Sequence, residues 1–305
     1  MKTYFRLGLF AIIGILLAVF ILVPSTVTIR ETTAFRSSIA ATKRFVFQDS
    51  NWKHWLINKA AYDTSYKMHV NNHFYSTIGV EVTNGDQRFE TDLIVLPYAQ
   101  DSTGIDWRDT VHITWNPFTR FSQYSDAIKL QNHMKAVLSQ MTAFLNDKKS
   151  VYGITVEREQ VRDRPLLSHR VIMQRKPTAE DAYQMIDALK VYAKSQGDTS
   201  TEPAMKYSSQ IDSVNYELMV AIPTASMLKA TKDYVPKGLV GGNPLFTVIR
   251  GGEATIDSAW KAMYQYKEDY QLSAPAIPYE MMITDRRKET DPGKWITKIV
   301  FPTRL

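Results

Sequence analysis

The C-terminal half of the chain repeats one order of predicted elements, and this duplication constrains the fold more than any other sequence feature. In the first copy, the hydrophobic pattern predicts a strand, a helix and two further strands at residues 166–174, 178–195, 204–209 and 216–223. The second copy has the same order at residues 244–250, 255–270, 278–284 and 295–302. Each copy is a β-α-β-β unit, and the repeats extend over about residues 154–224 and 243–305.

The two predicted helices indicate how each copy buries its apolar side chains. Thr178 and Asp181 approximate a capping box for the first helix, Gly197 is a suitable stop after it, and Thr255 can cap the second. The buried faces are formed by Tyr183, Ile186, Leu189 and Val191 in the first helix, and by Ile256, Trp260, Met263, Tyr264 and Tyr270 in the second. Two such units pack most simply as one antiparallel sheet with both helices on one face. The other face, or the seam between the units, is then the place for a ligand.

The middle of the chain predicts a separate domain over residues 27–150. A strand at residues 27–38 is followed by a short helix at residues 39–47. Three more strands and a long closing helix are predicted at residues 76–83, 88–97, 110–115 and 126–148. A chain of 305 residues is long enough for this domain and for the duplicated one at residues 154–305. The predicted fold class is therefore α+β, with antiparallel sheets.

The amino terminus predicts a membrane segment. Residues 7–23 carry neither a charge nor a strongly polar side chain, and they follow Lys2 and Arg6. Such a run spans on the order of 25 Å as a helix, so an uncleaved transmembrane helix at residues 1–26 is favoured over the alternative of a cleaved signal peptide. Positive charge before the segment predicts a single-pass protein of the inner membrane. In a bacterium, its folded domains would lie on the periplasmic side.

Composition excludes several functional classes. The net charge is +6, but the 37 basic residues are scattered among 31 acidic ones, so no nucleic-acid partner is predicted. The chain has no cysteine, which excludes disulfides, thiol nucleophiles and thiolate zinc sites. The common catalytic and cofactor-binding motifs are missing, so neither a catalytic residue nor a cofactor is predicted. His69 and His73 would suit a metal only on a helix, and no metal site is predicted.

Specific motifs in the second copy resemble a known family. Gly251-Gly252-Glu253 precedes the helix, IPYEMMITD follows it at residues 277–285, and PGKWITKIVFP ends the copy at residues 292–302. The first copy contributes PAMKY at residues 203–207 and YELMVAIP at residues 216–223. Together these segments resemble the GyrI-like, or bacterial transcription activator effector-binding, domain.

The resemblance implies a ligand site between the repeats. Members of the family bind small organic molecules, often cationic or amphipathic, through a buried glutamate and aromatic side chains. By position this glutamate is Glu280, and a cationic ligand would supply the partner that a carboxylate among apolar residues needs. A structural hydrogen bond to a tyrosine or to the backbone is the alternative for Glu280. The other ligand-binding candidates are Tyr207, Glu217, Phe246, Trp260, Tyr264, Tyr279 and Trp295. Core packing is the alternative for Trp260, Trp295 and Phe246, and an outward-pointing side chain is the alternative for Glu217.

The middle region resembles the START/SRPBCC, polyketide cyclase-like fold. The resemblance rests on RSSIA at residues 36–40 and FVF at residues 45–47, followed by Trp52 and Trp55. It implies a helix-grip domain in which an antiparallel sheet wraps the long helix. Such a domain either holds an apolar ligand or acts as a spacer. Core packing is the alternative to ligand contact for both tryptophans.

These features predict a membrane-anchored small-molecule-binding protein. Its partner would be a small organic molecule or lipid, apolar or cationic, held between the two repeats. A regulator of transcription is not expected, because no helix-turn-helix precedes the module. One alternative is a hydrolase that uses Glu280 as base and Tyr207 as orienting acid. The other is a structural or partner-binding periplasmic module, in which methionines fill the seam, for example Met205, Met219, Met281 and Met282.

Overall fold

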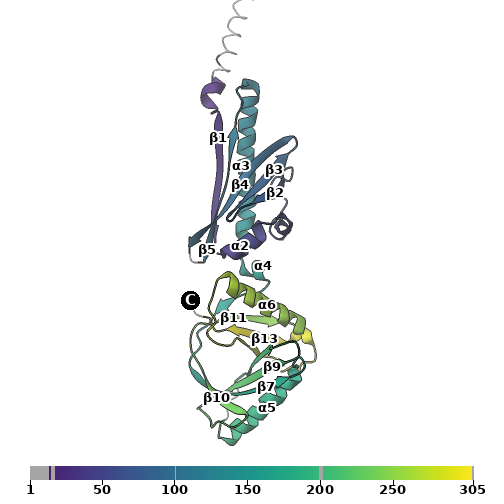
Figure 1. The fold of residues 1–305 in the computed structure, drawn as a ribbon. Coiled ribbons are helices and arrows are strands. Elements are labelled where there is room, and N and C mark those ends of the chain that lie inside the picture. Colours follow the sequence, from purple (N-terminus) through teal and green to yellow (C-terminus); the bar gives the residue numbers. More distant parts are fainter. Residues whose placement is uncertain (1–13, 15–17, 100, 199–201, 304–305) are drawn as a thin grey trace, which may run out of the picture. The chain divides into compact units, whose positions relative to one another are not determined.

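The chain divides into two compact units, Met1–Asp147 and Lys148–Leu305, which are called here the N-terminal and C-terminal units. The computed structural model describes residues 14, 18–99, 101–198 and 202–303. Figure 1 labels the helices and strands of both units. The α+β prediction with antiparallel sheets is confirmed, because each unit contains one antiparallel sheet with helices packed on it.

The predicted transmembrane anchor is corrected by the structure. Among the residues that are described, no helix is both long and apolar enough to cross a membrane. Much of the predicted segment, residues 1–13 and 15–17, lies outside the described residues, and residues 18–22 are helical. A membrane-spanning helix needs roughly 20 apolar residues. The single-pass inner-membrane location and the membrane partner inferred from this segment are therefore not supported.

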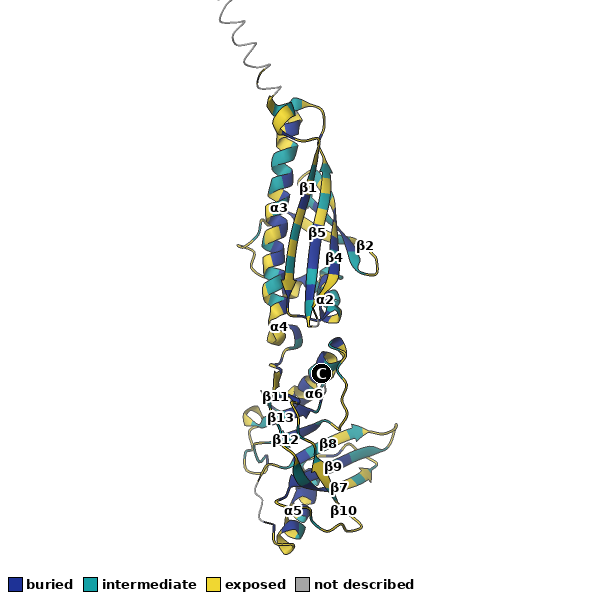
Figure 2. Ribbon diagram, turned by 90° about the vertical axis from the view of Figure 1, so that its left-hand side faces the viewer, coloured by how far each residue is buried: buried dark blue, intermediate teal, exposed yellow. Residues whose placement is uncertain are grey.

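The N-terminal unit is a five-stranded antiparallel sheet in the order β1-β5-β4-β3-β2. Helix α3 packs against strand β1, and Figure 2 shows buried residues along these elements. In chain order the elements are β1 (Thr26–Phe35), α2 (Ile39–Val46), a 3₁₀ helix η1 (Asp49–His54), β2 (Lys67–His73), β3 (Thr77–Asn84), β4 (Gln87–Ala99), β5 (Ser102–His112) and α3 (Pro117–Asn146).

The core of this unit follows the predicted helical stripe. The side chains that α3 turns toward the sheet are at most 3% exposed, and they are Leu130, Met134, Val137, Leu138, Met141 and Leu145. Trp52 and Trp55 are also buried, and their indole N–H groups donate to the carbonyls of Val46 and Phe45 at 2.8 and 3.0 Å. Both tryptophans therefore have a structural role, as the core-packing interpretation predicts.

Two strand assignments in this unit differ from the sequence prediction. Strand β5 begins at Ser102, eight residues before the predicted start at residue 110. Strand β2 was not predicted, because KMHVNNH lies at the edge of the sheet and is mostly exposed, so it lacks apolar alternation. His69 and His73 lie on this strand rather than on a helix, and no group of ligands suited to a metal occurs among the described residues.

The C-terminal unit is built on an eight-stranded sheet in the order β10-β7-β9-β8-β12-β13-β11-β6. The first repeat supplies β7, α5, β8 and β9, the second supplies β11, α6, β12 and β13, and the two meet where β8 pairs with β12. The strands are β6 (Glu157–Arg158), β7 (Arg164–Met173), β8 (Met205–Gln210), β9 (Tyr216–Pro223), β10 (Tyr234–Leu239), β11 (Leu245–Arg250), β12 (Tyr279–Met282) and β13 (Ile296–Phe301). The helices are α4 (Lys148–Tyr152), α5 (Ala179–Ser195), α6 (Glu253–Asp269) and the 3₁₀ turn η2 (Pro292–Lys294).

Both long helices of this unit cover the same face of the sheet. Helix α5 packs on β7 and β9, where it contacts Leu167, Leu218 and Val220. Helix α6 packs on β11 and β13, where it contacts Leu245 and Ile299. Neighbouring residues of a strand point to opposite faces, so the residues next to these in sequence face the other side of the sheet. That side is called here the open face.

The segments that lead into the two repeats exchange places. Strand β6 precedes the first repeat but pairs with β11 of the second, and β10 precedes the second repeat but pairs with β7 of the first. Residues 157–163 and 238–244, called here the crossing segments, meet at a bridge between Val161 and Gly242 with N···O distances of 2.8 and 2.9 Å. A Cβ atom at Gly241 would lie 2.8 Å from the Val161 carbonyl, so glycine allows this close approach.

Two of the three predicted helix starts and stops are observed. Thr178 and Asp181 form the predicted capping box, and Gly197 follows α5 with a φ of +84°. The prediction for the second helix was wrong: Gly252 is the N-cap of α6, and Thr255 lies within its first turn. A glycine cap offers no side-chain oxygen, so the preference for Ser or Thr at this position gave a misleading signal.

Replacing Thr178 with alanine should therefore loosen the start of α5. The capping oxygen accepts from the Asp181 amide, and its loss costs roughly 1 kcal/mol, or about fivefold in local opening. Amide hydrogen exchange in the first turn of α5 measures this change. Thr255→Ala is the matched control, because Thr255 does not cap α6. Equal protection of α5 in the Thr178 variant and the parent would contradict the role of the cap.

Candidate functional site

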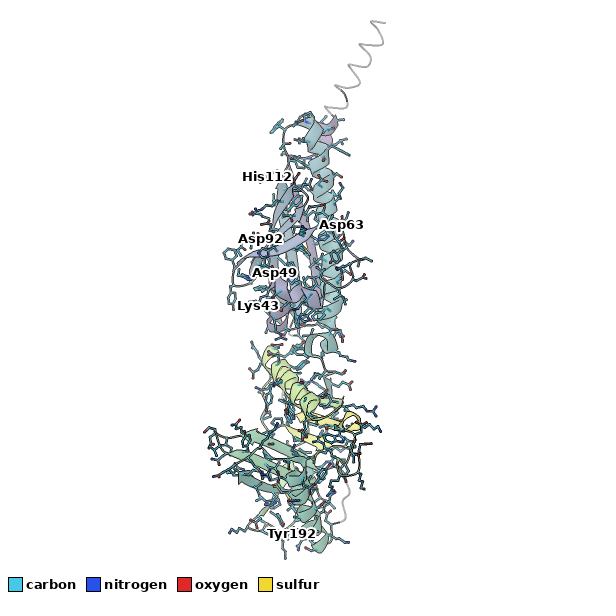
Figure 3. All side chains as sticks on the ribbon, turned by 90° about the vertical axis from the view of Figure 1, so that its right-hand side faces the viewer. Lys43, Asp49, Asp63, Asp92, His112 and Tyr192 are labelled. Atoms are coloured by element: carbon cyan, nitrogen blue, oxygen red, sulfur yellow. The ribbon has the colours of Figure 1, made fainter. Side chains whose placement is uncertain are left out.

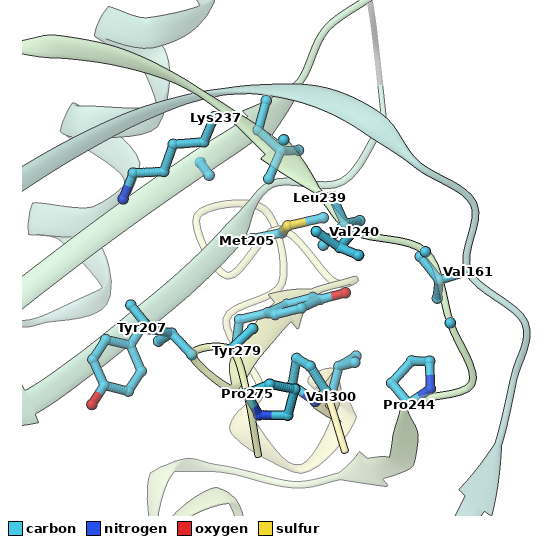
Figure 4. A pocket seen from close by; sticks show the side chains of 18 of the residues that line it. Val161, Met205, Tyr207, Lys237, Leu239, Val240, Pro244, Pro275, Tyr279 and Val300 are labelled. Carbon is cyan, nitrogen blue, oxygen red and sulfur yellow. The ribbon is translucent and has the colours of Figure 1, made fainter. Parts of the chain in front are cut away.

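A cavity of about 580 Å³ lies on the open face of the C-terminal sheet. Its floor combines both repeats, because buried side chains from five strands meet there, namely Leu166, Met205, Ala221, Tyr279 and Val300. Figure 4 shows Met205, Tyr279 and Val300 around this space. Alternation along the strands explains the set, since each of these residues neighbours one that faces the helices. The cavity thus lies on one of the two places that the duplication predicts for a ligand.

The crossing segments form a wall of the cavity. Val161 comes from the first crossing segment and Val240 and Pro244 from the second, while Pro275 and Ile277 come from the loop before β12. Figure 4 places Val161, Val240 and Pro244 on the side opposite Tyr207. The bridge between Val161 and Gly242 holds the two segments together at this wall. The cavity therefore depends on the exchange of β6 and β10 between the repeats.

Tyr279 contributes a hydroxyl group to the largely apolar floor. Its side chain reaches into the cavity (Figure 4), and the residue is only 8% exposed. Burial raises the pKa of Tyr279 to about 12, with a smaller contribution from the charge of Glu159. Among the residues that the structure describes, this hydroxyl has no hydrogen-bond partner. It is therefore a protonated donor that is free to bond a ligand. The other floor hydroxyl, that of Ser168, already donates to the Val235 carbonyl at 2.8 Å.

The predicted glutamate lies on the other face of the sheet. Glu280 is 4% exposed, and one carboxylate oxygen accepts from Lys206 Nζ at 2.7 Å. The other accepts from Trp260 Nε1 of α6 at 3.2 Å. Glu280 and Lys206 are opposite each other in the pairing of β12 with β8, so both point toward the helices. Glu280 is thus held by a lysine and an indole rather than by the tyrosine or backbone group of the alternative interpretation, and it does not line the cavity.

The remaining predicted residues fall into two groups. Tyr207 lines the cavity, and Phe246 packs beside its floor with Lys298 Nζ 4.5 Å from its ring. Glu217 is on the open face but forms an ion pair with Arg170.

The three other candidates pack around α6 and the loop before β13. Trp260 and Tyr264 contact the ring of Phe301, and the Trp295 indole donates to the Glu289 carbonyl at 2.8 Å. Of the eight candidates, only Tyr207 and Tyr279 line the cavity.

The methionines do not fill the seam between the repeats. Met205 and Met219 line the cavity, and Met281 packs at its edge. Met282 points the other way and packs against the core beneath α5. The space that remains after these side chains are placed is about 580 Å³. The seam-filling arrangement expected for a purely structural module is therefore not observed on the open face.

Sequence reasoning missed the crossing segments and β10. These supply Arg158, Val161, Lys237 and Val240 to the cavity. None of them belongs to a run with apolar periodicity, because β6 has two residues and β10 contains Pro236 and Gly238. The one available signal was the pair of glycines at residues 241–242, which marks a close backbone approach.

Comparisons with known proteins concern the fold. No family model matches the chain, and no curated protein does. Among solved structures, the EcmrR C-terminal domain is 16% identical over 50% of this chain and 98% of that chain, with a TM-score of 0.39. A hydrolase from Listeria innocua is 13% identical over 49% and 92% of the two chains, with a TM-score of 0.38. The structure of SAV2435 bound to tetraphenylphosphonium is 14% identical over 50% and 94%, with a TM-score of 0.34.

Proposed function

We propose that the C-terminal unit binds a small organic molecule with an apolar body in the cavity on its open face. The observation that carries this proposal is the cavity itself, which has a volume of about 580 Å³ and a floor of aliphatic, methionine and tyrosine side chains. Ligand pockets of roughly 300–1,000 Å³ that combine apolar walls with a few polar groups are typical of small-molecule sites. The free hydroxyl of Tyr279 is such a polar group.

The geometry does not favour the hydrolase alternative. That mechanism needs Glu280 and Tyr207 to act on the same substrate atom. Lys206 pairs with Glu280 on the helix-covered face, and Tyr207 is the next residue along β8, so its side chain points to the open face. The two proposed catalytic groups are therefore separated by the sheet.

Filling the cavity should weaken binding. Ala221 is a small floor residue and is 7% exposed, so larger side chains at this position take up ligand space. With a neutral probe such as 2-naphthylacetamide, we expect isothermal titration calorimetry on the full chain to show a loss of at least about tenfold for Ala221→Leu and more for Ala221→Phe. A tenfold loss corresponds to about 1.4 kcal/mol.

The matched control is Val191→Leu, which enlarges an exposed side chain on α5. This helix covers the face of the sheet opposite the cavity. The control variant should bind the probe like the parent chain. Circular dichroism melting of each variant shows whether the fold is kept. Binding that is unchanged in a folded Ala221→Phe variant would show that the probe occupies some other place, and would contradict the proposal.

A further inference from the structure

The charged residues that line the cavity are all basic. They are Arg158, Lys206 and Lys237, and the described lining residues include neither aspartate nor glutamate. Lys206 is neutralised by Glu280 at 2.7 Å on the covered face. Two positive charges, those of Arg158 and Lys237, are therefore left at the cavity without an acidic neighbour in its lining.

Arg158 and Lys237 form no ion pair with any residue that the structure describes. The Arg158 guanidinium donates to the Asn243 carbonyl at 2.8 Å, which positions the side chain but leaves its charge uncompensated. Lys237 Nζ lies 3.4 Å from the sulfur of Met219, a weak acceptor. Both residues are exposed, so they stay charged at the rim of the cavity and remain accessible to a ligand.

Of the three acidic residues in the first crossing segment, Glu157 is exposed and does not line the cavity, and the other two are engaged elsewhere. Glu159 pairs with Lys298 at 2.6 Å. Asp163 accepts from the Gly241 amide at 2.5 Å, and neither carboxylate lines the cavity. A cleft lined by one sign of charge beside apolar walls concentrates ligands of the opposite sign. The field at this cavity thus favours an anion and disfavours a cation.

Tyr279 adds an independent observation within the cavity. The residue is largely buried, and its hydroxyl reaches into the space and has no hydrogen-bond partner among the described residues. Burial keeps this group protonated, so it can donate a hydrogen bond to an oxygen of an anionic ligand. Hydrogen bonds to an ionised carboxylate are shorter and stronger than those to a neutral acceptor. An ammonium group, in contrast, would be repelled by the charges of Arg158 and Lys237, and the described lining residues would offer it no carboxylate partner.

We infer that the cavity selects organic anions, namely carboxylates on an apolar body. Arg158 and Lys237 attract the carboxylate, and the floor buries the apolar body. This inference rests on the proposed function of the same cavity. It departs from the cationic ligand that the sequence resemblance implies. The departure has a structural cause, because Glu280 is held by Lys206 on the covered face and does not line the cavity.

Three probes with one apolar body test the sign of the charge. We expect calorimetry on the full chain at pH 7 to rank 2-naphthylacetate first, with the neutral 2-naphthylacetamide at least about tenfold weaker and 2-(2-naphthyl)ethylammonium weakest. The advantage of the carboxylate should shrink as salt is added, because exposed charges are screened over about 10 Å at 0.1 M ionic strength. Equal or tighter binding of the amide would overturn the inference and leave the proposed apolar site in place. No binding of any of the three probes would overturn both.

Charge removal locates the effect. Lys237→Met and Arg158→Met should each weaken 2-naphthylacetate several-fold and leave 2-naphthylacetamide nearly unchanged. Lys190→Met on α5 is the matched control, since it removes the same charge from the exposed part of a helix on the covered face. If the Lys190 variant weakens the carboxylate as much as the other two do, the preference comes from the overall charge of +6, and the assignment to the cavity is wrong.

Discussion

Glu280→Ala should lower the free energy of unfolding of the C-terminal unit by about 3–5 kcal/mol, the cost of breaking a buried ion pair from one side. The side chains of Lys206 and Glu280 are 11% and 5% exposed, so the variant leaves a lysine charge without its partner in a largely water-excluded place. The Trp260 indole loses its acceptor as well. Amide hydrogen exchange in β8 and β12 measures the loss in the full chain, because it separates the C-terminal unit from the other.

A paired replacement is the control for this variant. Lys206→Met combined with Glu280→Leu removes both charges at once, and buried ion pairs replaced by apolar residues of similar volume are often neutral in stability. The double variant should therefore recover most of the loss. A single Glu280→Ala variant that costs less than about 1 kcal/mol would contradict the buried-pair account. Binding of 2-naphthylacetamide by Glu280→Gln should match the parent, since Glu280 does not line the cavity.

The N-terminal unit should lose stability in acid through His133. This residue of α3 is 3% exposed, stacks on Tyr66 with ring centroids 4.5 Å apart, and also contacts Tyr62. Neither ring nitrogen has a hydrogen-bond partner among the described residues. Burial lowers the pKa of His133 from 6.5 to about 4, although the charge of Asp63, which is labelled in Figure 3, opposes the shift.

The direction of the pH effect follows from proton binding. Between pH 6.5 and 4 the unfolded chain takes up a proton at this histidine and the folded unit does not, so stability falls as the pH is lowered. The loss is complete below about pH 4 and amounts to about 3 kcal/mol, at 1.36 kcal/mol for each pH unit. Above pH 6.5 the contribution to stability is fully present.

His133→Phe should remove this part of the pH dependence. Phenylalanine fits beside the two tyrosines and cannot be protonated, so the variant should lose about 3 kcal/mol less than the parent between pH 7 and pH 4. Denaturant titrations with hydrogen exchange in α3 give the difference. His73→Gln, at an exposed position of β2, is the control. Parallel stability profiles for the parent and the His133 variant would show that His133 does not sense pH.

Local patterns in the sequence located most of the elements that build the cavity. The apolar periodicity of the two copies predicted α5, α6 and the six strands of the repeats, and strand β9 has the predicted ends at Tyr216 and Pro223. Such patterns are local, because each element buries one face whatever its neighbours are. Tyr207 and Tyr279, in contrast, became ligand-binding candidates through the resemblance to the GyrI-like domain, and both line the cavity.

The sequence by itself determined the duplication, the capping box at Thr178 and the alternation that turns Tyr279 and Glu280 to opposite faces. Only the tertiary structure decided which face holds the cavity and which residues are engaged elsewhere. The pairing of β6 with β11 and of β10 with β7 joins residues about 70 to 90 positions apart, and two short strands without apolar alternation carry no local signal of that choice. The same is true of Glu280: its environment was predictable, but its partner Lys206 became visible only when β8 and β12 were placed side by side.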